Sequence, residues 1–305
     1  MRVISVLPSA TEIVCALGHA SELVGRSSEC DYPPEVQTAP IVMRPRTWDS
    51  ERPSREIDAR VRGARSRNES LYELDVDLLR RLAPDLLLTQ DLCGVCSVTE
   101  EEVASACATA GVRPKVVSLT PTNLDQVWTT VETVGEALGD SVRGRELARA
   151  LRDRSRPVPR TGRKVAVVEW LDPPILAGLW TPDIVAAAGG DPLGPKTAEP
   201  GARTSWAELA RQTPDLVVLS PCSFSVERSN RELARPALRS EVLSSRPPLG
   251  TYVADEAYFS RPGPRLVDSL EILANALHPD IHPLPEGLPA AIRVDVACEP
   301  AGDVA

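Results

Sequence analysis

The sequence predicts an α/β protein with two lobes built on parallel sheets, joined by one long helix, with a ligand cleft between the lobes. The chain has 305 residues, enough for two domains at ~150 residues each. Short β-rich runs alternate with helical segments in both halves, which is typical of parallel sheets. Residues 123–154 contain no proline and carry apolar residues at helical spacing, which predicts the linking helix.

The first strand and helix are predicted from their boundary residues. A β-rich run covers residues 2–7, and Ser9 follows it with Glu12 three positions later. This spacing is that of a capping box, in which each side chain satisfies a backbone N–H of the other residue. Apolar residues then recur at helical spacing, and Gly18 is expected to end the helix in the left-handed conformation.

The later elements alternate regularly, and the segment 44–70, which is polar and rich in arginine, is expected to be a flexible loop. In the first half we predict strands at 23–25, 41–43, 85–89 and 116–119, and helices at 78–82 and 100–110. In the second half we predict strands at 164–168 and 216–219, and helices at 183–188, 206–211 and 265–277. The predicted domains are residues 1–121, the linking helix 122–156, the second lobe 157–282 and an irregular tail 283–305.

A short internal repeat relates the two halves. Pro84-Asp85 precedes an apolar strand that leads to Cys93, and Pro214-Asp215 precedes another that leads to Cys222. Open parallel sheets place their sites outside the carboxyl ends of the strands. We therefore expect both cysteines to face a shared cleft.

Composition and charge exclude several classes of protein. The chain has 34 Lys and Arg against 43 Asp and Glu, a net charge of −9, whereas a nucleic-acid surface usually carries a positive stripe. The sequence has no uninterrupted apolar run long enough for a membrane span, and its first residues lack the core of a signal peptide. We expect a cytoplasmic protein that binds a small molecule or metallo-ligand and has no transporter partner, and in which cysteines are free, metal-bound or catalytic.

Four of the seven cysteines follow predicted strands in segments rich in turn residues: Cys30, Cys93, Cys96 and Cys222. A C-x-x-C turn such as Cys93–Cys96 lets two thiolates bind one metal ion. With Cys30 and Cys222 the set would suit zinc or an iron–sulfur cluster. Three thiolates would leave an open position for a substrate.

Two other interpretations of the cysteines stay open. All four can be buried thiols without a ligand, since free cysteine is often buried. The C-x-x-C pair can also be a redox pair, which usually begins a helix, and a helix is predicted just after Thr99. Cys15 and Cys107 lie on predicted helices and Cys298 in the predicted tail, so we expect no special role for them.

Three carboxylates near the predicted strand ends are candidates for proton transfer: Glu29, Asp91 and Glu169. Their spacing in the sequence does not pair them with one another. The chain has three histidines, too few for a site built from several histidines, and it contains neither a Walker motif nor a G-x-G-x-x-G motif.

Four further residues are candidates for ligand binding. Trp170 and Trp180 follow the first strand of the second half and would offer indole faces to a flat or apolar ligand, or else pack within the lobe. Tyr258 and Arg261 precede the last predicted helix. Arg261 near a helix N-terminus would bind an anionic group, unless it is an ordinary surface arginine.

Residues 2–13, which read RVISVLPSATEI, resemble the opening of the cobalamin- and siderophore-type periplasmic solute-binding proteins, the class III family. The strand at Pro84–Leu88, the long helical span and the repeated lobe are similar to that family as well, so the resemblance covers about residues 1–280. It implies two Rossmann-like lobes joined by a rigid backbone helix, with a ligand held between them.

Within that family the chain looks closest to a leaderless, cysteine-containing branch that is labelled cobalamin-binding. The similarity lies in the motifs E-C-D-Y-P at 29–33, D-L-C at 91–93, E-W-L-D-P-P at 169–174, P-C at 221–222 and F-S-R-P-G-P-R at 259–265. Three functions remain open: a binding protein for a thiolate-ligated metal, iron–sulfur cluster or metallo-ligand; an iron–sulfur enzyme; and a corrinoid carrier. The corresponding cofactors are an iron–sulfur cluster, zinc or cobalamin.

Overall fold

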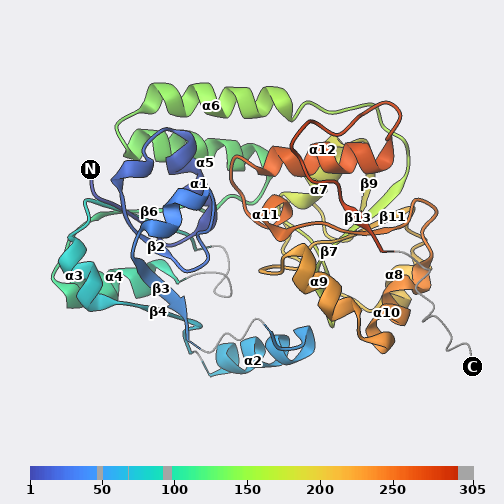
Figure 1. Ribbon diagram of the computed structural model, residues 1–305, viewed down its shortest axis with the longest axis horizontal. Helices are drawn as coiled ribbons and strands as arrows, with labels where there is room; N and C mark the ends of the chain where they lie inside the picture. Colours follow the sequence, from blue (N-terminus) through green and yellow to red (C-terminus); the bar gives the residue numbers. More distant parts are fainter. Residues whose placement is uncertain (47–50, 68, 92–97, 295–305) are drawn as a thin grey trace, which may run out of the picture. The chain divides into compact units, whose positions relative to one another are not determined.

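The computed structural model describes residues 1–46, 51–67, 69–91 and 98–294, which form two compact units (Figure 1). Unit 1 comprises Met1–Arg52, Glu56–Arg156 and Arg261–Val267. Unit 2 comprises Pro53–Arg55, Pro157–Ser260 and Asp268–Ala305. No helix in the described part of the chain is both long and apolar enough to cross a membrane.

Unit 1 is built on a sheet of order β4-β3-β2-β1-β5-β6. Its strands are β1 Val3–Ser5, β2 Leu23–Ser27, β3 Ile41–Pro45, β4 Tyr72–Leu74, β5 Leu86–Thr89 and β6 Lys115–Ser118. Five strands run parallel, and the edge strand β4 is antiparallel to β3. The helices are α1 Pro8–Ala16, α2 Ser54–Ser66, α3 Val76–Leu82, α4 Glu100–Ala110, α5 Leu124–Ala137 and α6 Ser141–Arg154, with short 3-10 helices at Ala20–Glu22 and Pro34–Thr38.

Both faces of the unit 1 sheet are covered. Ile4 of β1 and Leu87 of β5 pack with Leu79 of α3 and Val103 of α4 in one apolar cluster. Side chains alternate between the faces of a strand, so the neighbours of Leu87 point to the opposite face. Leu86 and Leu88, which flank Leu87 in β5, are fully buried on that face as well. The continuous apolar runs of these strands thus reflect helices on both sides.

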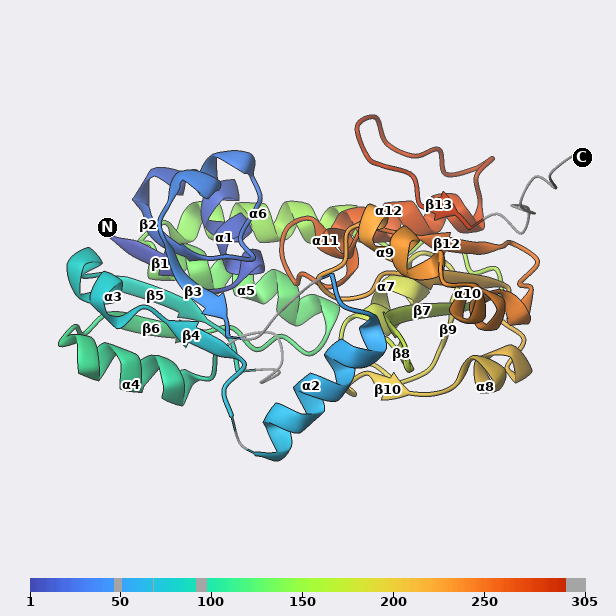
Figure 2. The same ribbon diagram turned by 60° about the horizontal axis from the view of Figure 1, so that its bottom comes forward.

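Unit 2 has a mixed sheet of order β10-β8-β7-β11-β12-β13, with β9 paired to β7 (Figure 2). Its strands are β7 Lys164–Leu171, β8 Pro174–Leu176, β9 Asp191–Leu193, β10 Ala202–Arg203, β11 Leu216–Leu219, β12 Thr251–Val253 and β13 Ile292–Arg293. Its helices are α7 Thr181–Ala187, α8 Trp206–Arg211, α9 Val226–Leu233, α10 Pro236–Val242, α11 Glu256–Phe259 and most of α12 Leu266–Leu277, with a 3-10 helix at Leu243–Ser245. The parallel prediction holds for the centre of the sheet, whereas β8, β10 and β13 are antiparallel to their neighbours.

The predicted internal repeat is confirmed by one contact that occurs in both units. Asp85, just before β5, accepts a hydrogen bond from the backbone N–H of Arg2 at 2.7 Å. Asp215, just before β11, accepts one from the backbone N–H of Lys164 at 2.7 Å. Each aspartate thereby satisfies the first N–H of the neighbouring parallel strand, β1 or β7. The same Pro-Asp dipeptide sets the same strand pairing twice.

The prediction of a single helix over residues 123–154 is wrong, because this span forms two helices, α5 and α6. Gly139 adopts a left-handed φ of +80°, which ends α5 as glycine commonly does. Asp140 then begins α6, since its carboxylate accepts a hydrogen bond from the Arg143 N–H at 3.4 Å. Figure 1 shows the two helices side by side.

Two glycines allow α5 and α6 to lie this close. A Cβ atom placed on Gly135 would lie 2.7 Å from the Cα of Gly144, and one placed on Gly144 would lie 3.1 Å from the Cα of Gly135. Both neighbours are backbone atoms, so neither can move aside cheaply. These two glycines form the contact that packs the two helices.

The capping box predicted at Ser9 and Glu12 is also wrong. Helix α1 has Leu7 as its N-cap, without a side-chain hydrogen bond. Glu12 instead pairs with Arg265, a stronger partner than a backbone N–H because it is charged. A capping box does occur at α4, where Thr99 and Glu102 exchange hydrogen bonds at 3.2 Å and 2.7 Å.

Two segments expected to be irregular contain regular structure. Residues 54–66, within the expected loop 44–70, form helix α2. Its arginines alternate with acidic and apolar side chains, and a polar composition alone does not exclude a helix. Within the expected tail, β13 pairs antiparallel with β12.

Substitution of Gly135 by alanine should destabilise unit 1 by ~1–3 kcal/mol, the usual range for overpacking a tight contact. Gly63 in α2 is the matched control, because a Cβ atom there would meet only the end of the Arg67 side chain, at 3.3 Å. Gly63→Ala should be neutral or stabilising by up to ~1 kcal/mol through helix propensity. Thermal and urea unfolding of both variants measures this; equal effects would contradict the close contact of α5 and α6.

Candidate functional site

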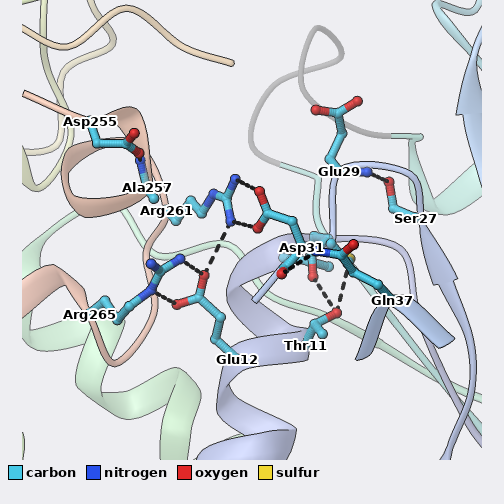
Figure 3. A network of polar contacts seen from close by, with 12 residues as sticks. Thr11, Glu12, Ser27, Glu29, Asp31, Gln37, Asp255, Ala257, Arg261 and Arg265 are labelled. Atoms are coloured by element: carbon cyan, nitrogen blue, oxygen red, sulfur yellow. Dashed lines mark hydrogen bonds and ion pairs between the residues drawn. The ribbon is translucent and has the colours of Figure 1, made fainter. Parts of the chain in front are cut away.

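Unit 1 contains a buried ion-pair network of Glu12, Asp31, Arg261 and Arg265, which we call the Glu12 network (Figure 3). Glu12 is only 3% exposed. Arg265 donates to both of its carboxylate oxygens, at 2.9 Å and 2.6 Å, and Arg261 reaches it at 3.5 Å. Arg261 also donates to Asp31, with one of the two contacts at 3.1 Å.

The four residues come from three separate parts of the chain. Glu12 lies on α1 and Asp31 in the turn after β2, while both arginines belong to the segment Arg261–Val267. The Arg265 guanidinium also lies over the Tyr32 ring, 3.9 Å from its centre, a cation–π contact. Breaking a buried ion pair by removing one partner typically costs ~3–5 kcal/mol, so the network fixes the turn after β2 to α1.

Arg261 was predicted to bind an anionic ligand at a helix N-terminus. In the structure its guanidinium is 9% exposed and bonds to Asp31 and Glu12, while α12 begins at Leu266. Hydrogen bonds and charge from Arg261, with the charge of Arg265, hold the pKa of Asp31 below its usual range although burial acts to raise it. A role for Arg261 in ligand binding stays a prediction.

Cys30 lies beside this network and is fully buried. The Thr11 hydroxyl donates to the Cys30 sulfur at 3.0 Å, and the thiol points to the Ser5 carbonyl at 3.9 Å. Burial raises the pKa of Cys30 to about 11, while the Thr11 hydrogen bond and the charges of Arg261 and Arg26 act in the opposite direction. At neutral pH and without a metal, Cys30 is therefore a protonated thiol.

Glu29 precedes Cys30 and is the carboxylate with the best properties for proton transfer in unit 1. Burial raises the pKa of Glu29, and the charge of Arg261 and a hydrogen bond from the Ser28 hydroxyl at 3.4 Å oppose this only in part. A raised pKa keeps a proton available closer to neutral pH. The second predicted carboxylate, Asp91, is exposed.

Cys93 and Cys96 lie outside the described residues. In the part of the chain that is described, no group of three or more His, Cys, Asp or Glu side chains is placed to hold a metal ion. Cys15 on α1 is half-buried, and burial raises its pKa to about 12, which agrees with the ordinary packing role expected for it. Cys107 is buried in α4, as expected.

Unit 2 gathers aromatic and charged side chains near the ends of β7 and β11. Trp170 packs on Phe224, with 5.3 Å between ring centres. The Arg228 guanidinium lies 4.2 Å from the centre of the Phe224 ring and pairs with buried Glu232 at 3.1 Å. Trp170 is 7% exposed, and its indole N–H lacks a hydrogen-bond partner among the described residues.

Cys222 and Glu169 are brought together at this strand edge. The backbone N–H of Cys222 donates to the Glu169 carbonyl at 3.0 Å, and the Cys222 thiol contacts the Ser260 hydroxyl at 3.5 Å. Cys222 is half-buried. A Cβ atom placed on Gly201 would lie 2.0 Å from a carboxylate oxygen of Glu169, so the Glu169 side chain would have to move if residue 201 carried a side chain.

The remaining predicted ligand residues, Trp180 and Tyr258, lie in unit 2, and their role in ligand binding stays a prediction. Trp180 is 8% exposed, and its indole N–H donates to the Phe259 carbonyl at 3.0 Å. Both hydrogen-bonding and apolar parts of Trp180 are thus satisfied within unit 2. Tyr258 lies half-buried on the short helix α11.

Several residues that build these surroundings were not predicted as site residues. Most of their roles depend on partners distant in sequence: Asp31, Tyr32, Arg265, Phe224 and Arg228. The same applies to Asp172, which accepts a forked pair of hydrogen bonds from Arg55 at 3.0 Å and 3.1 Å. One signal was present: the motifs at 29–33 and 259–265 carry opposite charges, and these charges pair.

The stability contributed by Asp31 should depend on pH. Its folded pKa is below the ordinary value of 3.8, so this contribution is present above pH 3.8 and is lost as the pH falls through the folded pKa. Asp31 is half-exposed, so the difference between wild type and Asp31→Asn should be ~1 kcal/mol or less at pH 6. Unfolding from pH 7 to 3 should show the two proteins converging at low pH; a constant difference would contradict the ion pair.

Thiol reactivity should follow the raised pKa values. In metal-free protein at pH 8, Cys15 and Cys30 should resist iodoacetamide, because pKa values of about 12 and about 11 leave little thiolate. Both should react after unfolding in urea, and mass spectrometry of peptides locates the label. Rapid labelling of Cys30 in the native protein would show that its surroundings differ from those described.

Comparison with known proteins identifies the fold. No family model matches the chain, and no curated protein matches it either. Among solved structures, the chain is similar to a periplasmic heme-binding protein from Pseudomonas aeruginosa, with 21% identity, a TM-score of 0.70 and coverage of 97% of this chain and 99% of that one. It is also similar to the periplasmic heme-binding protein RhuT from Roseiflexus sp. RS-1, with 22% identity, a TM-score of 0.65 and coverage of 91% of this chain and 98% of that one. A third similar structure is the vitamin B12 binding protein BtuF of Vibrio cholerae, with 17% identity, a TM-score of 0.59 and coverage of 90% of this chain and 96% of that one. The chain therefore has the two-lobed α/β fold of the class III periplasmic solute-binding proteins.

Proposed function

We propose that this chain binds a metal-containing ligand in unit 1, with Cys30, Cys93 and Cys96 as thiolate ligands. The observation that carries the proposal is the strand order β2-β1-β5. β2 and β5 run parallel on either side of β1, so the turn that carries Cys30 and the residues Gln90 and Asp91, which precede Cys93 in the sequence, both follow the carboxyl edge of one sheet. That edge is where open α/β sheets place their ligands.

The surroundings of Cys30 suit a thiolate once a metal replaces the proton. The Thr11 hydroxyl already donates to the sulfur at 3.0 Å, and the charges of Arg261 and Arg26 favour the deprotonated form. Hydrogen bonds to a ligating sulfur are the usual outer shell of such sites. Burial opposes deprotonation, so the metal must bind sulfur tightly.

Three thiolates would leave one position of a tetrahedral metal or of a cluster iron open to a small molecule. An iron–sulfur cluster in this position would supply electron transfer or Lewis-acid chemistry; zinc is the simpler alternative. The names of the similar structures include heme and vitamin B12 as ligands, which supports a metal complex as cargo. A corrinoid carrier is the variant of this proposal that would not require the cysteines.

A second candidate function, an iron–sulfur-dependent enzyme, is favoured by Glu29. This carboxylate adjoins Cys30, and burial raises its pKa. A protonated glutamate next to a metal with an open position would act as a general acid. The substrate of such an enzyme would be a small molecule bound at the open position of the metal.

We further propose that the protein works in the cytoplasm, without a transporter. The described cysteines, Cys15, Cys30, Cys107 and Cys222, are all free, and free thiols persist in reducing compartments. Cell fractionation tests this location when the untagged protein is followed through the fractions by mass spectrometry. Recovery in an exported fraction would contradict it.

The first experiment is metal and sulfide analysis with an absorption spectrum on protein purified without oxygen. We expect bound metal, and for an iron–sulfur cluster a broad band near ~400 nm from thiolate-ligated iron. Cys30→Ala and the double variant Cys93→Ala/Cys96→Ala should each lose most of the metal. Cys222→Ala should keep some of the metal, because Cys30, Cys93 and Cys96 would still hold it.

Cys107→Ser is the matched control, since this cysteine is buried in α4 of the same unit. Titration with hemin and cyanocobalamin runs alongside. Metal-free wild-type protein that binds cyanocobalamin equally well with and without Cys30 would overturn thiolate ligation and favour the corrinoid carrier. Metal-free protein that binds neither compound would overturn the proposed function.

A further inference from the structure

Two of the three histidines of the chain, His278 and His282, lie together in unit 2. His278 directly follows helix α12, and His282 closes the next turn of backbone. The N–H of His278 donates to the Ala274 carbonyl and the N–H of His282 donates to the His278 carbonyl, each at 2.9 Å. The helical hydrogen-bond pattern thus continues to His282.

This backbone places the two imidazoles on one side of the turn. Residues four apart in a helical turn are neighbours, and the ring centres of His278 and His282 are 5.8 Å apart at an interplanar angle of 66°. A hydrogen bond from the Asn275 amide to the His282 carbonyl, at 2.8 Å, holds the turn in this form. Both histidines are half-buried, and Nε2 of His278 itself is buried.

The rings are suited to act as ligands because they are not used as ion-pair partners. The third histidine, His19, bonds to Glu22 and Asp140. By contrast, Nε2 of His278 has no hydrogen-bond partner among the described residues. Burial, with the nearby His282 and Arg163, lowers the pKa of His278.

The end of α12 also favours a bound cation. The last carbonyls of a helix carry partial negative charge, which stabilises cations near the C-terminus. The Arg163 guanidinium already lies at this end of the helix and donates a hydrogen bond to the Leu277 carbonyl at 3.2 Å. The charge of Arg163 opposes a second cation nearby, so only an ion that coordinates imidazole nitrogen strongly would bind. Among divalent ions these are nickel, copper and zinc.

We propose that His278 and His282 form a two-histidine site for a divalent transition metal at the end of helix α12. Water molecules would complete the coordination of the ion, as two imidazoles fill only part of it. Asp280, exposed in the turn between the histidines, is the nearest carboxylate in sequence. The bound ion would join the last turn of α12 to the segment that leads to β13. This site is independent of the cysteines in unit 1.

Calorimetric titration of the full chain with Ni²⁺ tests the site. His278→Gln and His282→Gln should each weaken one Ni²⁺ site by ~tenfold or more, since even the outer partners of a metal ligand are worth that much. His19→Gln is the matched control and should bind Ni²⁺ as the wild type does. All three variants keep the seven cysteines, so a thiolate site contributes equally to each titration.

A second measurement does not depend on substitution. Substoichiometric Cu²⁺, which is paramagnetic, should broaden the ring signals of His278 and His282 in the NMR spectrum and leave those of His19 sharp. Equal broadening of all three histidines would overturn the proposal. So would unchanged Ni²⁺ binding in both His278→Gln and His282→Gln, whatever the metal analysis of the cysteine variants gives.

Discussion

The buried carboxylate of Glu12 is the constraint on which unit 1 depends. A charged group with 3% exposure is stable only when it is paired and hydrogen-bonded, and Arg265 and Arg261 provide both. The arginines come from a segment that the chain reaches only after it has built most of unit 2. Unit 1 is therefore incomplete until residues 261–267 are in place. Removal of Glu12 or Arg265 alone would leave the other charge buried and unpaired, which lowers the free energy of unfolding more than removal of both.

The same network determines the chemistry of the turn after β2. Asp31 and Tyr32 are held by Arg261 and Arg265, and Cys30 immediately precedes them. The sulfur lies next to the Thr11 hydroxyl, which donates to it at 3.0 Å. Glu29 lies close enough to Arg261 for its charge to lower the pKa, yet burial still raises it. A buried thiol and a carboxylate with a raised pKa therefore lie side by side in the turn after β2.

Local and repeated patterns in the sequence predicted most of the central elements. The Pro-Asp dipeptides at 84–85 and 214–215 indicated the repeat, and both aspartates bond to the neighbouring strand. The prediction of a capping box failed because Glu12 has a distant partner, Arg265, that outweighs a local one. The prediction of one helix over 123–154 failed at Gly139, whose left-handed φ separates two helices with the same periodicity. Helix α2 was missed because its polar composition is also typical of loops.

The candidate site was predictable to the same degree. The position of cysteines after strands could be seen in the sequence, and the strand order now places the turn of Cys30 and the segment after β5 at one sheet edge. The ionic partners of Arg261 could not be seen, because pairing between motifs more than 200 positions apart leaves no local pattern. The partner of Trp180 could not be seen either: the Phe259 carbonyl accepts its indole N–H, while a role of its ring faces in ligand binding stays a prediction.

The proton on Cys30 limits which metals the proposed site can hold. A pKa of about 11 in place of 9.0 makes the thiolate ~3 kcal/mol harder to form than that of an ordinary cysteine, at 1.36 kcal/mol per pKa unit. Structural zinc in small thiolate sites binds with ~10–16 kcal/mol, which exceeds this penalty several-fold. Ions that bind sulfur weakly, such as magnesium or calcium, gain too little to remove the proton. In the proposed site, the burial of Cys30 would keep the thiol protonated until a metal with strong affinity for sulfur binds.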